Sequence, residues 1–432
     1  MTLSPTCPRR RVYLDANASH PLLPRVRERL ARAVLNEDDA LANPSSVHGP
    51  GQAAKKSLAE LKGLLSQFLG RSDADELIIS SGATEAINTA MRGFFQNRLS
   101  LGRRPVLFAS AVEHSAVLDT ARALDPQFVT LPVCPGGRLD GPAALALIEA
   151  RLADPETDAL LCLQAVNNET GGALGLEEFY PPLQMKFGAR FSRGALRSKK
   201  SVGLLEQEGR VFLLLDAAQA LGKMEDSGLR RLVHLSDYVA VSGHKLGAPS
   251  GIGALWVRPG SPFAPLLTGG SQERKRRAGS HNTLGILGWT EALADWRTQG
   301  EVYRERLARQ RDFLRERLGR IEGLHFNGAT ELCNTLNFHV KGCPEESLVL
   351  ALDLAGYSLS SGSACNSGAI RPSHVLTALG LDEETAKASL RVCLTVETSD
   401  EDVQGFVKVL ETKIHFIRDS RKRAQEFLAE IG

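Results

Sequence analysis

Apolar, strand-like runs alternate with helix-like segments along the first half of the sequence. The runs at 77–80, 105–110, 128–133 and 159–164 are each separated from the next by a segment with helical spacing. Because parallel strands need a long crossover connection, this alternation predicts a mostly parallel sheet covered by helices. After Thr283 the pattern changes to long helical segments mixed with short strands, which predicts a smaller α+β domain.

Composition and charge restrict the classes of protein to consider. With 432 residues, 43% hydrophobic and 24% charged, the chain is typical of a globular protein with two or three packed domains. The 52 basic and 50 acidic residues give no reason to expect direct binding of nucleic acid or a lipid surface. No apolar run is long enough to cross a bilayer, and the seven cysteines form no metal-type pair. We therefore expect no membrane, no metal and a reducing cytoplasm, with no secretory signal at the start.

Polar clusters follow the predicted strands at the ends where they should meet. In a parallel sheet, ligands bind beyond the carboxyl ends of the strands. Five clusters fall at such ends: Ser81 to Thr84, Glu113-His114, Asn167 to Glu169, Asp216 to Gln219, and Ser242 to Lys245.

Lys245 lies between the strand-like runs 238–241 and 252–257, surrounded by glycine and other small residues. A lysine held there loses hydration, so its pKa should fall and its amine becomes a nucleophile for a carbonyl. We take pyridoxal 5'-phosphate as the carbonyl partner. A solvated turn lysine remains the alternative on this segment alone.

A cofactor of this kind needs a site for its phosphate. The turn Ser81 to Thr84, which contains Ala83, precedes a helix expected at 85–95. It supplies backbone N–H groups and a favourable dipole, and Thr84 adds a hydroxyl. Ser242 and His244, beside the lysine, are further phosphate ligands. An ordinary helix N-cap is the alternative interpretation of the first turn.

The ring of the cofactor needs partners as well. Asp216 is the candidate that keeps the pyridine nitrogen protonated, Gln219 and Asn168 are candidates to donate to the ring oxygen, and His114 is the candidate that stacks on the ring. Singly, each also has a structural interpretation: a turn residue for the aspartate and a packed side chain for the histidine.

Seven motifs occur in order along nearly the whole chain: SGATEAIN (81–88), EHSAV (113–117), VNNETG (166–171), DAAQALGK (216–223), SGHKLGAPSGIGAL (242–255), GGSQERKRRAGSHN (269–282) and SSGSACNSG (360–368). This set resembles the cysteine desulfurases of the class V aminotransferase-like, fold type I pyridoxal-phosphate family, with selenocysteine lyase a close relative. The resemblance implies an α/β fold: a large domain, 16–295, with a mostly parallel seven-stranded sheet, and a small α+β domain, 1–15 and 296–432.

The resemblance also implies a chemistry. L-cysteine would become L-alanine, with Lys245 carrying the proton and the sulfur held on Cys365 as a persulfide. Arg391 would grip the substrate carboxylate, with Asn168 beside it. The sulfur would pass to an acceptor or scaffold protein for iron–sulfur cluster assembly or tRNA thiolation. A homodimer is implied, in which Ser280 reaches the phosphate bound by the partner subunit.

Three departures from the family pattern stand out. Relatives commonly have an ATTP-like tetrad at 18–21, where this chain has ASHP, and a glycine-arginine pair near 395–397, where it has TVE. The basic excursion at 186–209 has no counterpart. These departures bear on the accessory partner and on the surface that passes on sulfur. Selenocysteine lyase, a class V aminotransferase and a non-catalytic dimeric scaffold paralogue remain as alternatives.

Overall fold

The computed structural model describes residues 11–35, 39–72, 76–187, 210–361 and 372–431. The chain forms two compact units. The larger comprises His20–Asn168 and Gly172–Glu301, and the smaller comprises Met1–Ser19, Glu169–Gly171 and Val302–Gly432. The predicted boundaries at 15/16 and 295/296 lie a few residues before these divisions, and one uninterrupted helix runs through the second of them.

A seven-stranded sheet is the centre of the larger unit, as predicted. Every strand runs parallel to the others except β8, which is antiparallel to both of its neighbours. In spatial order the strands are β2 (Leu77–Ser80), β8 (Gly253–Val257), β7 (Tyr238–Ser242), β6 (Val211–Asp216), β5 (Thr157–Gln164), β3 (Arg104–Ser110) and β4 (Val129–Leu131).

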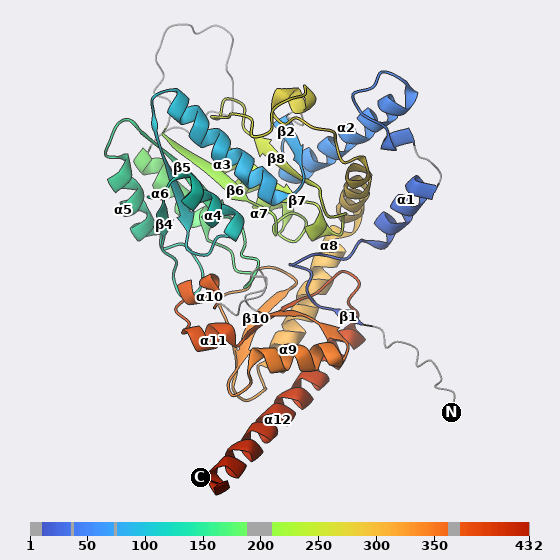
Figure 1. The fold of residues 1–432 in the computed structure, drawn as a ribbon, viewed down its shortest axis with the longest axis vertical. Helices are drawn as coiled ribbons and strands as arrows, with labels where there is room; N and C mark the ends of the chain where they lie inside the picture. The colour runs from blue at the N-terminus through green and yellow to red at the C-terminus, as the bar shows by residue number, and fades with distance from the viewer. Residues whose placement is uncertain (1–10, 36–38, 73–75, 188–209, 362–371, 432) are drawn as a thin grey trace. The chain divides into compact units, whose positions relative to one another are not determined.

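Helices cover both faces of this sheet. The central strands β5, β6, β7 and β8 are buried along their whole length, as expected for a sheet with two covered faces. Helices α3 (Ala83–Ser100) and α4 (Ser115–Leu124) lie in front of the sheet in Figure 1. The other elements of this unit are α1 (Pro24–Leu35), η1 (Asp39–Leu41), α2 (Gly49–Leu69), α5 (Gly141–Leu152), α6 (Leu176–Phe187), α7 (Asp226–Leu235), η4 (His244–Leu246) and η5 (Gln272–Lys275).

The core beneath α3 consists of large apolar side chains from the helix and the strands. Met91 and Phe94 of α3 pack on Phe212 of β6 and Tyr238 of β7, all of them buried. The rings of Phe94 and Phe212 meet edge to face, with centroids 5.1 Å apart. This packing fixes the start of α3 at the edge of the sheet.

The smaller unit contains an antiparallel sheet of four strands, in the order β12 (Ser360–Ser361), β13 (Ser389–Cys393), β10 (Thr335–Val340) and β9 (Leu324–Phe326). Beside it, β1 (Val12–Tyr13) pairs with β11 (Tyr357–Ser358). Its helices are α9 (Glu345–Leu354), α10 (His374–Ala378), α11 (Glu383–Lys387) and α12 (Asp400–Ile431).

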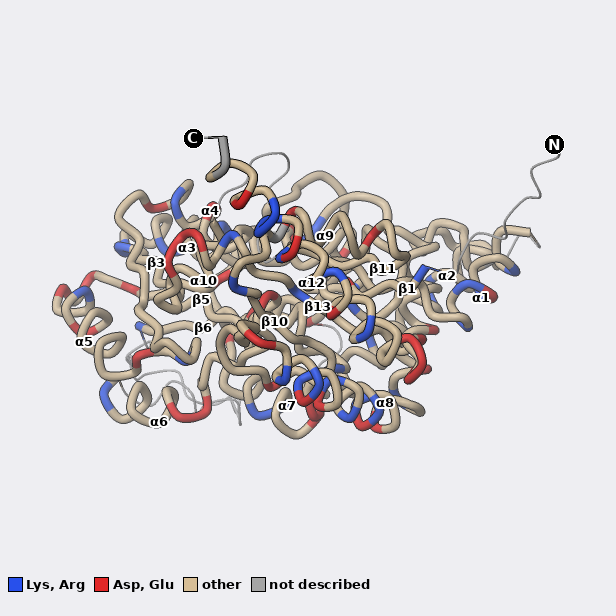
Figure 2. The backbone as a smooth tube through the Cα atoms, turned by 90° about the horizontal axis from the view of Figure 1, so that it is seen from below, with Lys and Arg blue, Asp and Glu red and all other residues tan. Residues whose placement is uncertain are grey.

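Helix α8 (Thr283–Leu318) spans 36 residues and contains the boundary between the units. Acidic and basic residues alternate along it, as Figure 2 shows in red and blue. Such mixed charge suits an exposed helical face. None of the helices in the described residues combines the length and apolar character needed to cross a membrane.

Candidate active site

The five predicted polar clusters lie at one end of the large sheet, where its parallel strands terminate. This carboxyl end of the strands is called the sheet edge below. Because β2, β3, β5, β6 and β7 run in the same direction, their carboxyl ends meet there. Asp216 is the last residue of β6, and Lys245 follows the end of the neighbouring strand β7. Adjacent strands are about 4.8 Å apart, so these two side chains come from neighbouring positions on the edge.

Glycines allow the Lys245 segment to lie against the core. Gly247 has φ +80°, and a Cβ there would be 2.7 Å from Leu23 Cγ. A Cβ on Gly243 would lie 2.9 Å from Ile252 and 3.2 Å from Trp289. Lys245 itself, in the short helix η4, is half-buried. The backbone therefore holds the lysine at the sheet edge with little freedom to move.

Asp216 is a buried carboxylate, and nearby positive charges favour its ionised form. Its Oδ1 accepts a hydrogen bond of 2.9 Å from the N–H of Ala218. Burial raises the pKa of Asp216, while this bond and the positive charges of His114 and Lys245 oppose the rise. A cationic ring nitrogen beside the carboxylate would favour ionisation further. The site thus fits a protonated pyridine.

His114 combines a structural and a functional placement. It is the N-cap of α4, and its Nδ1 accepts a hydrogen bond of 3.1 Å from the N–H of Ala116. In the neutral ring the proton is therefore on Nε2. The cap fixes the imidazole at the sheet edge, beside Asp216, where the sequence predicted a ring that stacks on the cofactor.

The first turn of α3 is suited to an anion. The sequence predicted a turn up to Thr84 and a helix from Glu85, but the helix begins at Ala83, because Gly82 adopts the N-cap position without a side-chain cap. The N–H groups of Ala83 and Thr84 therefore belong to the first turn, where the helix dipole attracts negative charge. A Cβ built on Gly82 meets nothing within 4 Å, so there is open space in front of this turn.

Ser242 and His244 lie together beside the lysine. Ser242 is buried at the end of β7, and its Oγ is 2.8 Å from Nδ1 of His244. Burial, then the charges of Lys245 and Lys223, lower the pKa of His244 to about 4. This histidine is thus neutral at physiological pH and offers hydrogen bonds rather than charge.

The amides predicted to contact the ring oxygen are also at this edge. Asn168 follows β5 and is half-buried. Gln219 follows β6 and is buried, and its Oε1 accepts a hydrogen bond from Lys223. The sequence analysis assigned no role to Lys223, although its spacing of four residues from Gln219 is that of neighbours on one helical turn.

Ser280 is exposed on a loop anchored to the first turn of α3. Arg277 of this loop contacts both carboxylate oxygens of Glu85, at 2.8 and 3.2 Å. The buried carboxylate of Glu273 is 2.8 Å from Nε2 of His281. These contacts hold the loop in place and leave the Ser280 hydroxyl at the surface.

Arg391 lies in the smaller unit, where it is almost completely buried on β13. Its Nη2 donates a 2.7 Å hydrogen bond to Asp15 Oδ1. The other oxygen of Asp15 accepts a 2.6 Å bond from Ser360, which is also the strand partner of Arg391. Cys365, five residues beyond Ser360, lies outside the described residues. The last described residues before it, Ser360 and Ser361, pair with Arg391 and Leu390 of β13.

A second buried acid lies near the same arginine. Glu169 accepts a 2.5 Å hydrogen bond from Ser373, just beyond the segment 362–371. Burial raises the pKa of Glu169 to about 7, opposed by the Ser373 bond and by the charge of Arg391. Glu169 belongs to the VNNETG motif and Asp15 to none of the seven motifs, and the sequence analysis gave neither a partner, because the residues they bind are hundreds of positions away.

In the departure at 18–21, His20 is buried, Ser19 and Pro21 are half-buried, and Ala18 is exposed. His20 is 5% exposed, and its backbone N–H donates a 3.0 Å bond to the carbonyl of His244. Its Nδ1 is 2.7 Å from the carbonyl of Pro21, so this nitrogen carries the proton. The substitution at His20 therefore changes what packs under the Lys245 segment, while Ala18 of the same tetrad is exposed.

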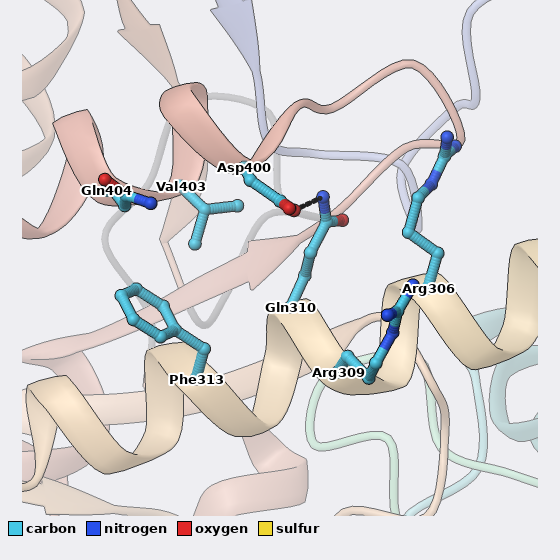
Figure 3. Close-up of a pocket in the computed structure, with 7 residues that line it drawn as sticks. All are labelled: Arg306, Arg309, Gln310, Phe313, Asp400, Val403 and Gln404. Carbon is cyan, nitrogen blue, oxygen red and sulfur yellow. Dashed lines mark hydrogen bonds between the residues drawn. The ribbon is translucent and has the colours of Figure 1, made fainter.

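Side chains of α8 form hydrogen bonds to the chain around 395–397, where the sequence departs from the family pattern. Arg306 donates to the carbonyl of Val396, and Gln310 donates to the carbonyl of Thr398 at 3.0 Å and to Asp400 at 2.8 Å. Beside these bonds is a shallow groove of about 230 Å³, shown in Figure 3. Its lining comprises Arg306, Arg309, Gln310, Phe313, Asp400, Val403 and Gln404. The groove belongs to the smaller unit, and its polar groups hold the chain that leaves β13.

Glu113 is completely buried at the sheet edge. Its Oε1 accepts hydrogen bonds from Ser110 Oγ, at 2.5 Å, and from the N–H of Gln164, at 3.0 Å. Burial raises the pKa of Glu113 from 4.5 to about 8, against the effect of these two bonds. The carboxyl group is thus protonated at neutral pH.

We expect Glu113→Gln to remove part of the pH dependence of stability. The folded protein keeps this proton from pH 4.5 to about 8, where the unfolded chain has lost it, so stability falls as pH rises through that range. The loss amounts to roughly 5 kcal/mol at most. Urea unfolding at pH 5 and 8.5 should show a smaller decline for Glu113→Gln than for the wild type or for the exposed control Glu156→Gln. Parallel declines in all three would contradict a protonated Glu113.

Comparisons with known proteins agree with this geometry. The profile of the aminotransferase class-V family matches residues 12–189 and 192–406. The cysteine desulfurase IscS of Dictyoglomus turgidum is 31% identical over 97% of this chain and 98% of its own length. The cysteine desulfurase of Nostoc sp. is 34% identical, with 94% of each chain covered. A solved NifS-like protein has a TM-score of 0.77 at 27% identity, over 94% of this chain and 100% of that one.

The match therefore spans both units of the chain and includes Lys245, Asp216 and Arg391. The chain belongs to the class-V aminotransferase family and, within it, to the cysteine desulfurases, which are pyridoxal-phosphate-dependent enzymes.

Proposed function

We propose that this protein converts L-cysteine to L-alanine and transfers the sulfur to Cys365 as a persulfide. The observation that carries the proposal is the placement of Lys245 and Asp216 at the ends of adjacent parallel strands, within a chain similar to cysteine desulfurases over 97% of its length. An amine beside a buried carboxylate suits a pyridoxal cofactor, which supplies an electron sink when bound.

Several residues of the larger unit each hold a different part of that cofactor. Lys245 Nζ is the point of covalent attachment, and Asp216 keeps the ring nitrogen protonated. The first turn of α3, at Ala83 and Thr84, holds the phosphate together with Ser242 and His244. A dipole and neutral hydrogen-bond donors suit a group that already carries two negative charges.

The remaining ring contacts come from three residues at the same edge. We assign stacking on the ring to His114, whose orientation is fixed by its cap on α4. Gln219 and Asn168 donate to the ring oxygen, and Asn168 also contacts the substrate. Ser280, exposed on its anchored loop, reaches the phosphate site of the partner subunit in a homodimer.

The chemical step uses two further side chains. Lys245 Nζ moves the proton released from the substrate Cα. The thiolate of Cys365 attacks the substrate sulfur, so one S–S bond forms as the Cβ–S bond breaks, and protonation of the remaining fragment gives alanine. Arg391 binds the substrate carboxylate, and its bond to Asp15 holds the guanidinium in one orientation.

The sulfur on Cys365 passes to an acceptor or scaffold protein, for iron–sulfur cluster assembly or tRNA thiolation. A reducing cytoplasm is the expected location, since the thiol of Cys365 stays reduced there until it accepts sulfur. Among the described residues, no disulfide joins Cys134, Cys162, Cys333, Cys343 or Cys393.

The deciding experiment is turnover of L-cysteine by the purified protein loaded with pyridoxal phosphate, in the presence of a thiol reductant. We expect alanine and sulfide in equal amounts. Borohydride reduction and peptide mapping should find the cofactor on Lys245. A loaded protein that releases neither product would overturn the proposal. Fast turnover of selenocysteine with little of cysteine would instead identify a selenocysteine lyase.

We expect Asp216→Asn to bind the cofactor covalently but to lose catalytic rate. The amide has the same shape but no charge to hold the ring nitrogen protonated, so kcat should fall by roughly 100-fold or more. Steady-state rates, with borohydride trapping to count loaded sites, measure the effect, and exposed Asp119→Asn is the control. An Asp216→Asn enzyme with unchanged kcat would show that the carboxylate does not act on the ring.

A further inference from the structure

The turn after β6 places Gln219 and Lys223 on the same side of one helical turn. Backbone bonds from the N–H of Leu221 and of Lys223 to the carbonyls of Ala217 and Ala220 give the turn its helical form. Lys223 Nζ donates a hydrogen bond of 2.7 Å to Oε1 of Gln219. The two side chains are 4% and 6% exposed, so this bond is formed away from solvent.

This bond fixes the orientation of the Gln219 amide group. An ammonium group has three donors and no acceptor, so the atom facing it must be the amide oxygen. The NH₂ group of Gln219 is consequently on the side away from Lys223. Without the lysine, the amide could rotate and present either its oxygen or its nitrogen to a ligand.

A close contact holds Lys223 in this position. Gly222 has φ +74°, and a Cβ there would lie 2.5 Å from Leu246 and 3.2 Å from Trp296. Trp296 in turn donates a 3.1 Å bond from Nε1 to the carbonyl of Leu246, the residue after Lys245. The turn that contains Lys223 is therefore packed against the segment that contains Lys245.

The electrostatics agree with this placement. After burial, which is the largest cause, the charge of Lys223 contributes to lowering the pKa of His20 to about 4. The charges of Lys245 and Lys223 likewise help burial to lower the pKa of His244. Lys223 is thus near enough to the Lys245 segment to affect groups on it.

We propose that Lys223 is a positioning residue that fixes the Gln219 amide with its N–H donors toward the ring oxygen of the cofactor. This inference rests on the proposed function, because it requires a cofactor on Lys245. A fixed donor at the ring oxygen stabilises the deprotonated oxygen and thereby lowers the pKa at which the visible absorbance of the bound cofactor changes. Lys223 acts through Gln219 and touches no reacting atom.

The test is a pH titration of the visible absorbance of the loaded protein, without substrate. We expect the midpoint to rise by about one pH unit or more in Lys223→Met, whose side chain has a similar length but no donor and no charge. Gln219→Met should shift the midpoint in the same direction. If Lys223 acts through Gln219, the double variant should shift no further than the larger of the two single shifts.

Two controls make the test specific. Lys223→Arg keeps the donor and the charge and should restore most of the wild-type midpoint, and exposed Lys186→Met should leave it unchanged. If Lys223→Met fails to fold, Lys223→Gln, which keeps a donor without the charge, replaces it and should give a smaller upward shift.

The inference is overturned if the titration midpoint of Lys223→Met stays at the wild-type value. It is also overturned if the double variant shifts the midpoint by the sum of the shifts of Lys223→Met and Gln219→Met. Failure of the proposed function gives a different result. In that case the wild type itself shows no absorbance band that borohydride fixes to Lys245, and Gln219 has no ring oxygen to face.

Discussion

Lys245→Ala is expected to abolish covalent cofactor binding and to reduce turnover of cysteine by at least about 1,000-fold. The variant loses both the amine that attaches the cofactor and the group that moves the Cα proton. Lys245 lies between Gly243 and Gly247, where a Cβ would be 2.9 Å from Ile252 and 2.7 Å from Leu23, respectively. Absorbance spectra and mass spectrometry after borohydride reduction should show no adduct.

Exposed Lys387→Ala is the matched control for Lys245→Ala, and it should keep the adduct and the full rate. Lys245→Arg separates the positive charge from both roles, since a guanidinium keeps the charge but neither attaches the cofactor nor accepts a proton. An adduct found on a different lysine, together with retained turnover, would contradict the assignment of Lys245.

Cys365→Ser is expected to keep the cofactor spectrum and to lose the release of sulfide and alanine by at least about 100-fold. A hydroxyl is a far weaker nucleophile toward sulfur than a thiolate, so the Cβ–S bond of the substrate would not be broken. The product assay and persulfide detection by mass spectrometry measure the loss.

The control for Cys365→Ser is Cys134→Ser, since Cys134 is a free and exposed cysteine of the described chain. It should retain the wild-type rate. Sulfide release that survives in Cys365→Ser would show that the sulfur leaves without a persulfide on this residue. A selenocysteine lyase would then become the better reading of the chain, provided that selenocysteine is still turned over.

The sequence alone determined the sheet and the edge on which the candidate site lies. Strand-like runs separated by helical segments leave little choice but a parallel sheet, and such a sheet brings the ends of its strands to one edge. The clusters that contain His114, Asp216 and Lys245 could therefore be grouped before the structure was known. The start of α3 was placed two residues late, because Gly82 gives no side-chain signal for an N-cap.

Only the tertiary structure decided which distant residues act on one another. Asp15 meets Arg391 across 376 positions, and Glu169 meets Ser373 across 204. No periodicity encodes such pairs, since they depend on how packed elements bring side chains together. The raised pKa of Glu113 likewise follows from complete burial, a property of the whole core around it and not of its neighbours in the chain.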